Sequence, residues 1–225
     1  MLRMIVFPTL LLTAIGSITA DQFASTADKK ISLAELAQAA DVIVLAQTRD
    51  TDYMYRRKFP VDGSAFLKVL ITYKTDKAAD MIEVYEHGLH AHECYFQNPT
   101  VFEEGRRYLL FLQKDAVHPE RYRGLAQGCA LDVLVDRDNR YVLRLPVTGI
   151  QVSDPLSGMA RGFEFADAYA VENDESLPPQ QRDTLLASGW IVPRGDGYIY
   201  TQGVDLSTVR ELMGKNGVTA AAPEK

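Results

Sequence analysis

The stretch EHGLHAHEC, residues 86–94, gathers more metal-ligating side chains than any other part of the chain. On an extended backbone His90, His92 and Cys94 would point to one side, because residues two apart share a face. Imidazole and thiolate groups are common ligands of zinc and copper. One hypothesis is therefore a zinc or copper site formed by His87, His90 and His92. The alternative is an ordinary solvated loop in which the histidines are neighbours by chance.

A second segment, DYMYRRKF at residues 52–59, interleaves aromatic and basic side chains. Such a mixture could stack on and neutralise an anionic ligand. The alternative is a strand extension whose rings pack and whose charges are solvated. As a contact surface for a protein or a polymer, this segment is the first candidate in the chain. Its residues are Tyr53, Tyr55, Arg56, Arg57, Lys58 and Phe59.

Other polar clusters lack the pattern of a calcium or catalytic site. The run DRDNR at residues 136–140 has no glycine at the sixth position of a calcium loop, and Val147 stands at the twelfth, where a glutamate is needed. It is predicted to be a hairpin turn. Glu103 and Glu104 are adjacent and would point apart on a strand. Because the sequence also has no G-x-S-x-G or H-E-x-x-H motif, we expect a non-enzymatic protein with no catalytic residues.

The first 20 residues have the pattern of a secretory signal peptide. Arg3 precedes an uncharged apolar run over residues 4–15, and small residues lead to a predicted cleavage after Ala20. This run is shorter than the about 20 residues of a transmembrane helix, which disfavours an uncleaved anchor, the alternative. No second long apolar run follows. The mature protein is therefore predicted to be periplasmic or secreted, without a transmembrane segment.

Cys94 and Cys129 are the only cysteines. In an oxidising compartment such a pair is expected to form one disulfide, and a reactive or metal-binding thiol pair is the alternative.

The net charge of the chain restricts the kinds of partner that it can bind. The chain has 24 basic and 30 acidic side chains, so removal of Arg3 with the leader leaves 23 against 30, a formal charge of −7. This balance argues against nucleic acid as a partner, because phosphate binding needs concentrated positive charge.

The rest of the sequence predicts many short strands and few helices. Ser32 and Glu35 form a capping-box pattern at the start of a short helix over 32–40. A long loop or distorted hairpin is expected over 50–63. The predicted strands cover residues 41–48, 65–73, 81–86, 107–113, 130–135 and 141–145. After residue 147 come a helix at 180–187, a hairpin of 190–192 with 198–200, and a helix at 206–213. This order is typical of a small barrel or sandwich with an appended segment.

Four segments in order give residues 31–145 a resemblance to a known family: the helix SLAELAQAAD, the strands VIVLAQT and FLKVLITYK, and FEEGRRYLLFLQK followed by GCALDVLV. The chain resembles bacterial exported proteins related to the tissue inhibitors of metalloproteinases and the netrin-like OB-fold. The resemblance implies a mainly β (α+β) fold, with a five- to six-stranded OB-like barrel, a short N-terminal helix and a C-terminal hairpin-plus-helix extension. It does not extend to protease inhibition, because the inhibitors use an N-terminal cysteine and none lies near the mature N-terminus here.

The expected organisation is a signal peptide (1–20), a flexible lead-in (21–30), an OB-like barrel domain (31–147), an extension packed on the barrel (148–214) and a disordered tail (215–225). These features predict an exported, non-enzymatic module of the cell envelope that binds a protein or a polymer and needs no cofactor. The alternative function is a periplasmic zinc- or copper-binding protein that uses His87, His90 and His92.

Overall fold

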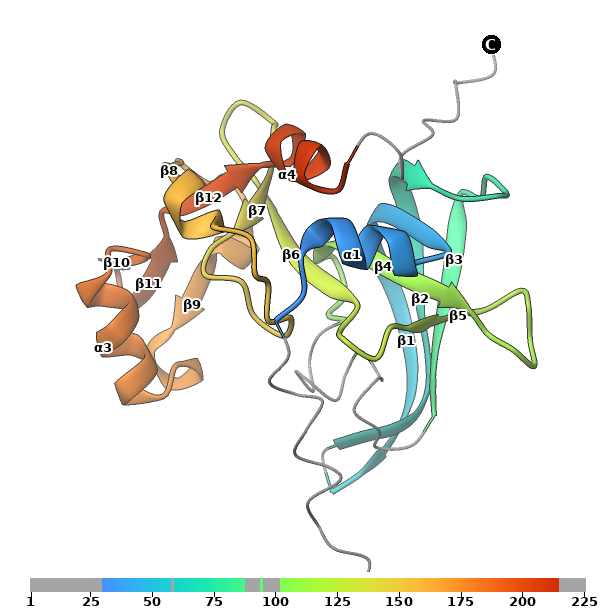
Figure 1. Cartoon of the computed structure of the whole chain (residues 1–225). Coiled ribbons are helices and arrows are strands. Elements are labelled where there is room, and N and C mark those ends of the chain that lie inside the picture. The colour runs from blue at the N-terminus through green and yellow to red at the C-terminus, as the bar shows by residue number, and fades with distance from the viewer. Residues whose placement is uncertain (1–29, 58, 88–93, 95–101, 215–225) are drawn as a thin grey trace, which may run out of the picture.

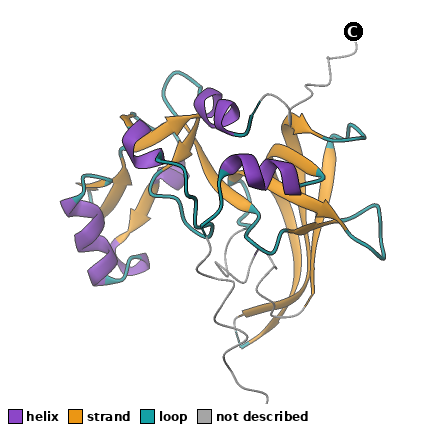
Figure 2. Ribbon diagram, in the orientation of Figure 1, coloured by secondary structure: helices purple, strands orange, loops and turns teal. Residues whose placement is uncertain are grey.

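The computed structural model describes residues 30–57, 59–87, 94 and 102–214 (Figure 1). The predicted signal peptide, all but the last residue of the lead-in, and the predicted tail lie outside these residues. Within them the chain is mainly β, with short helices at the edges of the sheets (Figure 2). No helix in the described part of the chain is both long and apolar enough to cross a membrane.

The two longest strands, β1 (Val42–Arg56) and β2 (Phe59–Lys74), form one antiparallel hairpin. Pairing continues through the region for which the sequence predicted a long loop or distorted hairpin, with irregularities in the register that bend the strands. Gly63 has a φ of 131°, and a Cβ added there would lie 2.0 Å from the carbonyl oxygen of Asp52. The close approach of the two strands therefore requires glycine at this position.

Among the described residues, a barrel closes in the strand order β1–β2–β3–β5–β4–β1. Its remaining members are β3 (Met81–His87), β4 (Arg107–Lys114) and β5 (Tyr122–Gly124). β3 and β5 pair in parallel through Val84 and Tyr122, and β1 pairs with β4 to close the barrel. This is an OB-like barrel, and the predicted fold class is confirmed. The three-residue β5 was not predicted, because it is too short to show alternation.

The first half of β1, residues 42–46, is buried on both faces, which explains its continuous apolar run. Val44 and Ala46 face a cluster to which every barrel strand contributes, so this cluster fills the barrel. Ile43 and Leu45 face a second cluster, which is covered by α1 (Leu33–Ala39). The predicted capping box is present, since the Ser32 hydroxyl accepts a hydrogen bond from the Glu35 backbone N–H at 3.2 Å and the Glu35 carboxylate accepts one from the Ser32 N–H at 2.9 Å.

The sheet continues beyond β4 through the predicted hairpin of β6 (Ala130–Val135) and β7 (Tyr141–Arg144). β12 (Gln202–Asp205) and β8 (Arg161–Gly162) complete this sheet. α4 (Leu206–Leu212) packs with α1 over the same apolar cluster. The C-terminal segment thus shares a core with the strands that extend the barrel.

A second, smaller sheet lies beside the barrel (Figure 1). Its order is β10 (Ile191–Arg194), β11 (Gly197–Tyr200) and β9 (Val171–Asn173), so the predicted C-terminal hairpin is present and β9 is an edge strand. α3 (Pro179–Ala187) packs against this sheet. Short 3-10 helices cover Leu156–Met159 (η2), Ala168–Ala170 (η3) and Asp174–Ser176 (η4).

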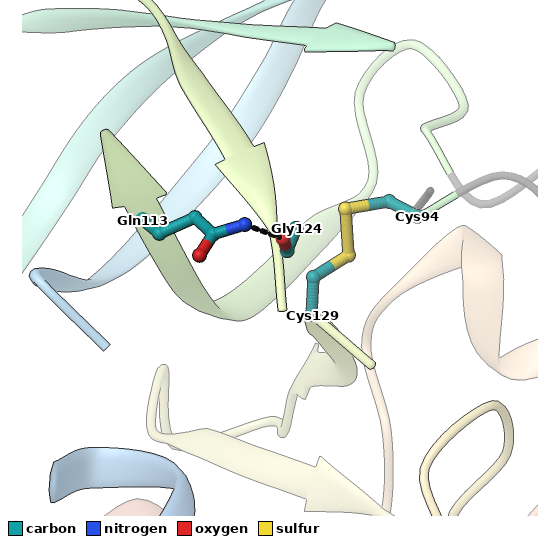
Figure 3. The surroundings of a disulfide bond; sticks show 4 residues. All are labelled: Cys94, Gln113, Gly124 and Cys129. Carbon is teal, nitrogen blue, oxygen red and sulfur yellow. Dashed lines mark hydrogen bonds between the residues drawn. A yellow bond between two sulfur atoms is a disulfide. The ribbon is translucent and has the colours of Figure 1, made fainter. Parts of the chain in front are cut away.

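Cys94 and Cys129 form the predicted disulfide, with their Cα atoms 5.6 Å apart (Figure 3). Cys129 directly precedes β6, and both side chains are buried in the barrel cluster. Nearby, the Gln113 side-chain amide donates a hydrogen bond to the carbonyl of Gly124 at 3.0 Å, which holds β5 against β4. The disulfide therefore attaches Cys94 to the residue at the start of β6.

Candidate binding cleft

The aromatic and basic segment predicted as a contact surface forms the far end of the β1–β2 hairpin. Tyr55 and its neighbour Met54 are each 63% exposed, so two large apolar side chains face solvent at this end. Arg56 is the last residue of β1, and Arg57 forms the turn with a φ of 51°. Phe59 begins β2, and Lys58 lies outside the described residues.

Tyr53 differs from its neighbours, because its ring packs against the barrel cluster and its hydroxyl oxygen is buried. The segment therefore combines both alternatives that its sequence left open. Tyr53 belongs partly to the core, whereas Tyr55, Arg56 and Arg57 are exposed. Together with Met54, these three residues are the side chains at this end that face solvent.

A cleft of about 570 Å³ lies between this hairpin and β9. β1 contributes Thr51, Tyr53 and Tyr55 to one wall, and all three residues of β9 contribute to the other. Four aromatic side chains line it: Tyr53, Tyr55, Phe102 and Tyr169. The hairpin residues singled out from the sequence thus form one side of a concave surface, whose other side comes from the C-terminal third of the chain.

Arg106 lies at the floor of the cleft, where its side chain is only 14% exposed. Its guanidinium lies 3.0 Å from the carboxylate of Glu103 and 4.0 Å from that of Asp132. Its Cζ is 5.5 Å from the centre of the Tyr169 ring, within the range of a cation–π contact. Burial disfavours the charged guanidinium and alone would lower the pKa of Arg106. The nearby groups that raise this pKa, of which Asp132 has the largest effect, outweigh burial, so the pKa lies above its ordinary value. Arg106 is therefore a fixed positive charge that is already paired.

A buried ionic network lies behind Arg106. Arg144, with a side chain 5% exposed, contacts the Asp132 carboxylate, and its other guanidinium nitrogen lies 3.7 Å from Glu172 of β9. Its Cζ also lies 4.5 Å from the centre of the Tyr200 ring. Because Asp132 belongs to β6 and Arg144 to β7, the network connects the extended barrel sheet to the smaller sheet. It positions the β9 wall of the cleft.

No sequence pattern marks Arg106, Tyr169 or Glu172 as a site residue. These residues come from three segments that are far apart in the chain, and none has a local pattern that marks it. Arg144 did carry a signal, since it is a charged residue at the end of the apolar strand YVLR. A charge in such a position requires a buried partner, but the sequence does not indicate which residue supplies it.

Of the three histidines predicted as metal ligands, the structure describes His87 alone; His90 and His92 lie outside the described residues. The Nδ1 atom of His87 lies 2.8 Å from the carboxylate of Asp62 and 3.4 Å from the hydroxyl of Tyr85. Its side chain is 64% exposed. Within the described ranges, no group of three histidine, cysteine, aspartate or glutamate side chains is arranged to hold a metal ion.

The DRDNR segment forms the turn between β6 and β7, as predicted. The Asp136 carboxylate accepts hydrogen bonds from the backbone N–H groups of Asp138 at 2.9 Å and Arg140 at 2.8 Å. Burial alone would raise the pKa of Asp136, but these N–H groups and the Arg140 guanidinium lower it below its ordinary value. The Asp136 carboxylate is therefore hydrogen-bonded within the β6–β7 turn.

Glu103 and Glu104 do not form an acid/base pair, because Glu103 pairs with Arg106.

A second groove, of about 790 Å³, lies between α4 and the β6–β7 turn. Tyr73 lines it, and burial raises the pKa of its hydroxyl. Two of the charged residues that border it are paired locally, Arg140 with Asp136 and Asp205 with Arg161. The cleft beside the hairpin is the stronger candidate, because it contains the exposed aromatic side chain of Tyr55.

No protein-family model, curated protein or solved structure matches the chain. The geometry of the cleft is therefore the basis for a functional proposal.

Proposed function

We propose that this protein is an exported, non-enzymatic binding module of the cell envelope, and that it contacts a protein or a polymer through the end of the β1–β2 hairpin and the adjoining cleft. The observation that carries the proposal is Tyr55, which is 63% exposed and lies at the wall of a 570 Å³ cleft. Tyrosine and arginine side chains are enriched where proteins bind one another. Arg56 and Arg57 supply the arginines at the same end.

Export is a separate part of the proposal. The leader pattern of residues 1–20 and the disulfide between Cys94 and Cys129 both support it, since disulfides persist in oxidising compartments. We also propose a distant relationship to the netrin-like group, supported by the OB-like barrel. Mass spectrometry of the native protein tests export directly: the expected mature chain begins near Asp21 and contains an intact disulfide. A chain that retains residue 1, or that has two free thiols, would contradict export.

The contact surface is tested with the variant Tyr55→Ala/Arg56→Ala/Arg57→Ala. Tyr53 is left unchanged because its ring packs against the core. We expect the variant to fold normally and to lose the partners that are recovered by affinity purification after chemical crosslinking in the native cells. A matched control, Val117→Ala/Arg137→Ala/Arg194→Ala, removes the same number of positive charges from exposed positions away from the hairpin. Equal recovery of partners with both variants would refute the contact surface.

The second candidate function is zinc or copper binding, and the contact between His87 and Asp62 favours it. Histidine ligands commonly donate one ring N–H to a carboxylate, which leaves the other nitrogen available to a metal. Nδ1 of His87 lies at hydrogen-bonding distance from Asp62, so Nε2 would be that nitrogen. The proposed ligands are His87, His90 and His92.

Calorimetry of the untagged mature protein with zinc and with copper tests the second candidate. If the site exists, we expect one equivalent of metal in the native chain, and weaker binding in both His87→Ala and Asp62→Asn. His118→Ala is the matched control, because His118 is half-exposed and also lies beside a carboxylate, Glu120, at 3.3 Å. Substoichiometric metal in the native chain would exclude this function.

A further inference from the structure

The groove between α4 and the β6–β7 turn combines an apolar floor with polar side chains at its rim. Its volume is about 790 Å³, and α4 lies beside β7 along one wall (Figure 1). Tyr73 and Leu206 belong to the apolar cluster under α1 and α4, and Tyr141 packs against the same cluster. Ile71 also lines the groove and is 38% exposed, so a large apolar side chain meets solvent there. The floor therefore suits the apolar body of a ligand.

Tyr73 brings a hydroxyl group to this floor. The residue is only 6% exposed, and its hydroxyl forms no hydrogen bond with any residue that the structure describes. A buried tyrosine hydroxyl usually has a hydrogen-bond partner. Because Tyr73 lines the groove, a ligand bound there can supply the partner.

One unpaired cation lies near this hydroxyl. Of the charged residues that line the groove, Arg140 and Asp205 are paired with residues that do not line it. Arg210 and Glu211 form no ion pair within the described part of the chain. They are consecutive in α4, so their side chains project about 100° apart around the helix axis. Arg210 lies near the Tyr73 hydroxyl, since its guanidinium acts to lower the pKa of that hydroxyl, against the larger effect of burial.

The guanidinium and the phenol hydroxyl are both hydrogen-bond donors, which specifies an acceptor as the head group of the ligand. The planar fork of N–H groups on arginine matches a carboxylate with two parallel hydrogen bonds. A carboxylate also carries a single negative charge, which one unpaired arginine balances. A dianionic phosphate would keep an excess negative charge beside Glu211, so the groove favours a carboxylate.

From this geometry we infer that the groove binds an amphipathic carboxylate, an organic acid whose apolar body lies on Ile71 and Tyr141 and whose carboxylate accepts hydrogen bonds from Arg210 and Tyr73. The inference does not depend on the contact proposed at the end of the β1–β2 hairpin, because the groove and the cleft share no lining residue.

Calorimetric titration of the mature protein with sodium decanoate, at concentrations below micelle formation, tests the class of ligand. We expect one decanoate to bind per chain. Acetate has the carboxylate without the apolar body, and decyltrimethylammonium has the apolar body with a positive head group. Each should bind at least tenfold more weakly than decanoate. Equal affinities for decanoate and either of these probes would overturn the amphipathic carboxylate.

Two variants test the head-group contacts. Arg210→Gln should weaken decanoate binding about tenfold, because a charged, hydrogen-bonded pair is lost. Tyr73→Phe removes one hydroxyl and should weaken binding about fivefold. Arg194→Gln is the matched control, since Arg194 is exposed, lies outside the groove and forms no ion pair with a described residue. The control should bind decanoate within about twofold of the native protein. Equal losses for Arg210→Gln and Arg194→Gln, or full affinity in both groove variants, would overturn the site.

The C-terminal residues of the chain are the alternative occupant, because Gly214 lines the groove and residues 215–225 follow it. A chain in which glycine and serine replace residues 218–225 tests this alternative. We expect it to bind decanoate with unchanged affinity. Binding at least tenfold tighter would overturn the inference, because the native residues 218–225 would then compete for the groove and be its occupant.

Discussion

The guanidinium of Arg106 lies over the ring of Tyr169, with 5.5 Å between its Cζ and the ring centre. Arg106 directly precedes β4, and Tyr169 lies in η3 just before β9. The hydroxyl of Tyr169 donates a hydrogen bond to the carbonyl of Glu104 in the same turn as Arg106. This pair of contacts fixes the barrel and the smaller sheet at the distance that forms the cleft.

Gly105 is required for this contact. Its φ is 84°, and a Cβ added there would lie 2.5 Å from the Tyr169 hydroxyl oxygen. We expect Gly105→Ala to lower the free energy of unfolding by about 2 kcal/mol, from backbone strain and displacement of Tyr169, measured by urea denaturation. Gly214→Ala is the control for strain alone, because Gly214 has a φ of 86° and nothing within 4 Å of an added Cβ. An equal cost at both glycines would show that the Tyr169 contact contributes nothing.

Arg144 is predicted to be the most sensitive charged residue of the fold. Arg144→Met leaves the Asp132 carboxylate in a buried position without its closest cation, and we expect a loss of about 3 kcal/mol of unfolding free energy. Asp132→Leu in the same chain should recover part of this loss, because the unpaired charge is then absent. The surface pair of Arg137 and Glu164 is the comparison, for which Arg137→Met should cost less than about 1 kcal/mol. A cost for Arg144→Met as small as that of Arg137→Met would contradict the buried network.

The disulfide should contribute substantially to stability. Cys94 and Cys129 are 35 residues apart, and closure of a loop of this length stabilises a fold by about 3 to 4 kcal/mol in the chain-entropy model. We expect Cys94→Ser/Cys129→Ser to lower the midpoint of urea unfolding accordingly. The native chain in a reducing agent should show the same decrease. A double variant as stable as the oxidised native chain would contradict this prediction.

Stability should also fall in acid, in part through Asp136. The pKa of this carboxyl is lower in the folded protein than its ordinary value of 3.8, so ionised Asp136 stabilises the fold above that value. This contribution is lost as the pH falls through the lowered folded pKa. Asp136→Asn should therefore destabilise the protein by about 1 to 2 kcal/mol near pH 7 and much less near pH 2. Urea unfolding across this range measures the difference, and a cost independent of pH would contradict the assignment.

Much of the barrel could be predicted because its signals are local. The capping box of Ser32 and Glu35 begins a helix where the sequence predicts one, and the apolar run of β1 indicates a strand buried on both faces. The β6–β7 hairpin follows from its turn residues. By contrast, β5 forms because it pairs with β3 and β4. A strand of three residues is too short to show an alternating apolar pattern, so its sequence does not indicate this pairing.

The candidate site could be predicted only in part. Tyr55 and Arg56 were identified because aromatic and basic residues alternate in one short segment. The opposite wall of the cleft comes from Tyr169 and β9, which the fold brings beside the hairpin through the Arg144 network. No periodic pattern in the sequence predicts that Tyr169 and β9 lie beside the hairpin. The sequence also did not distinguish Tyr53, a partly buried ring, from Tyr55, an exposed one.

Site-specific photo-crosslinking in the native cells tests most directly whether the end of the β1–β2 hairpin contacts a partner. A photoreactive amino acid replaces Tyr55, which is 63% exposed, or Val117, which is 78% exposed and lies outside the cleft. We predict a discrete, light-dependent crosslinked species from position 55 that position 117 does not give. No crosslink at position 55, or the same species from both positions, would contradict the account.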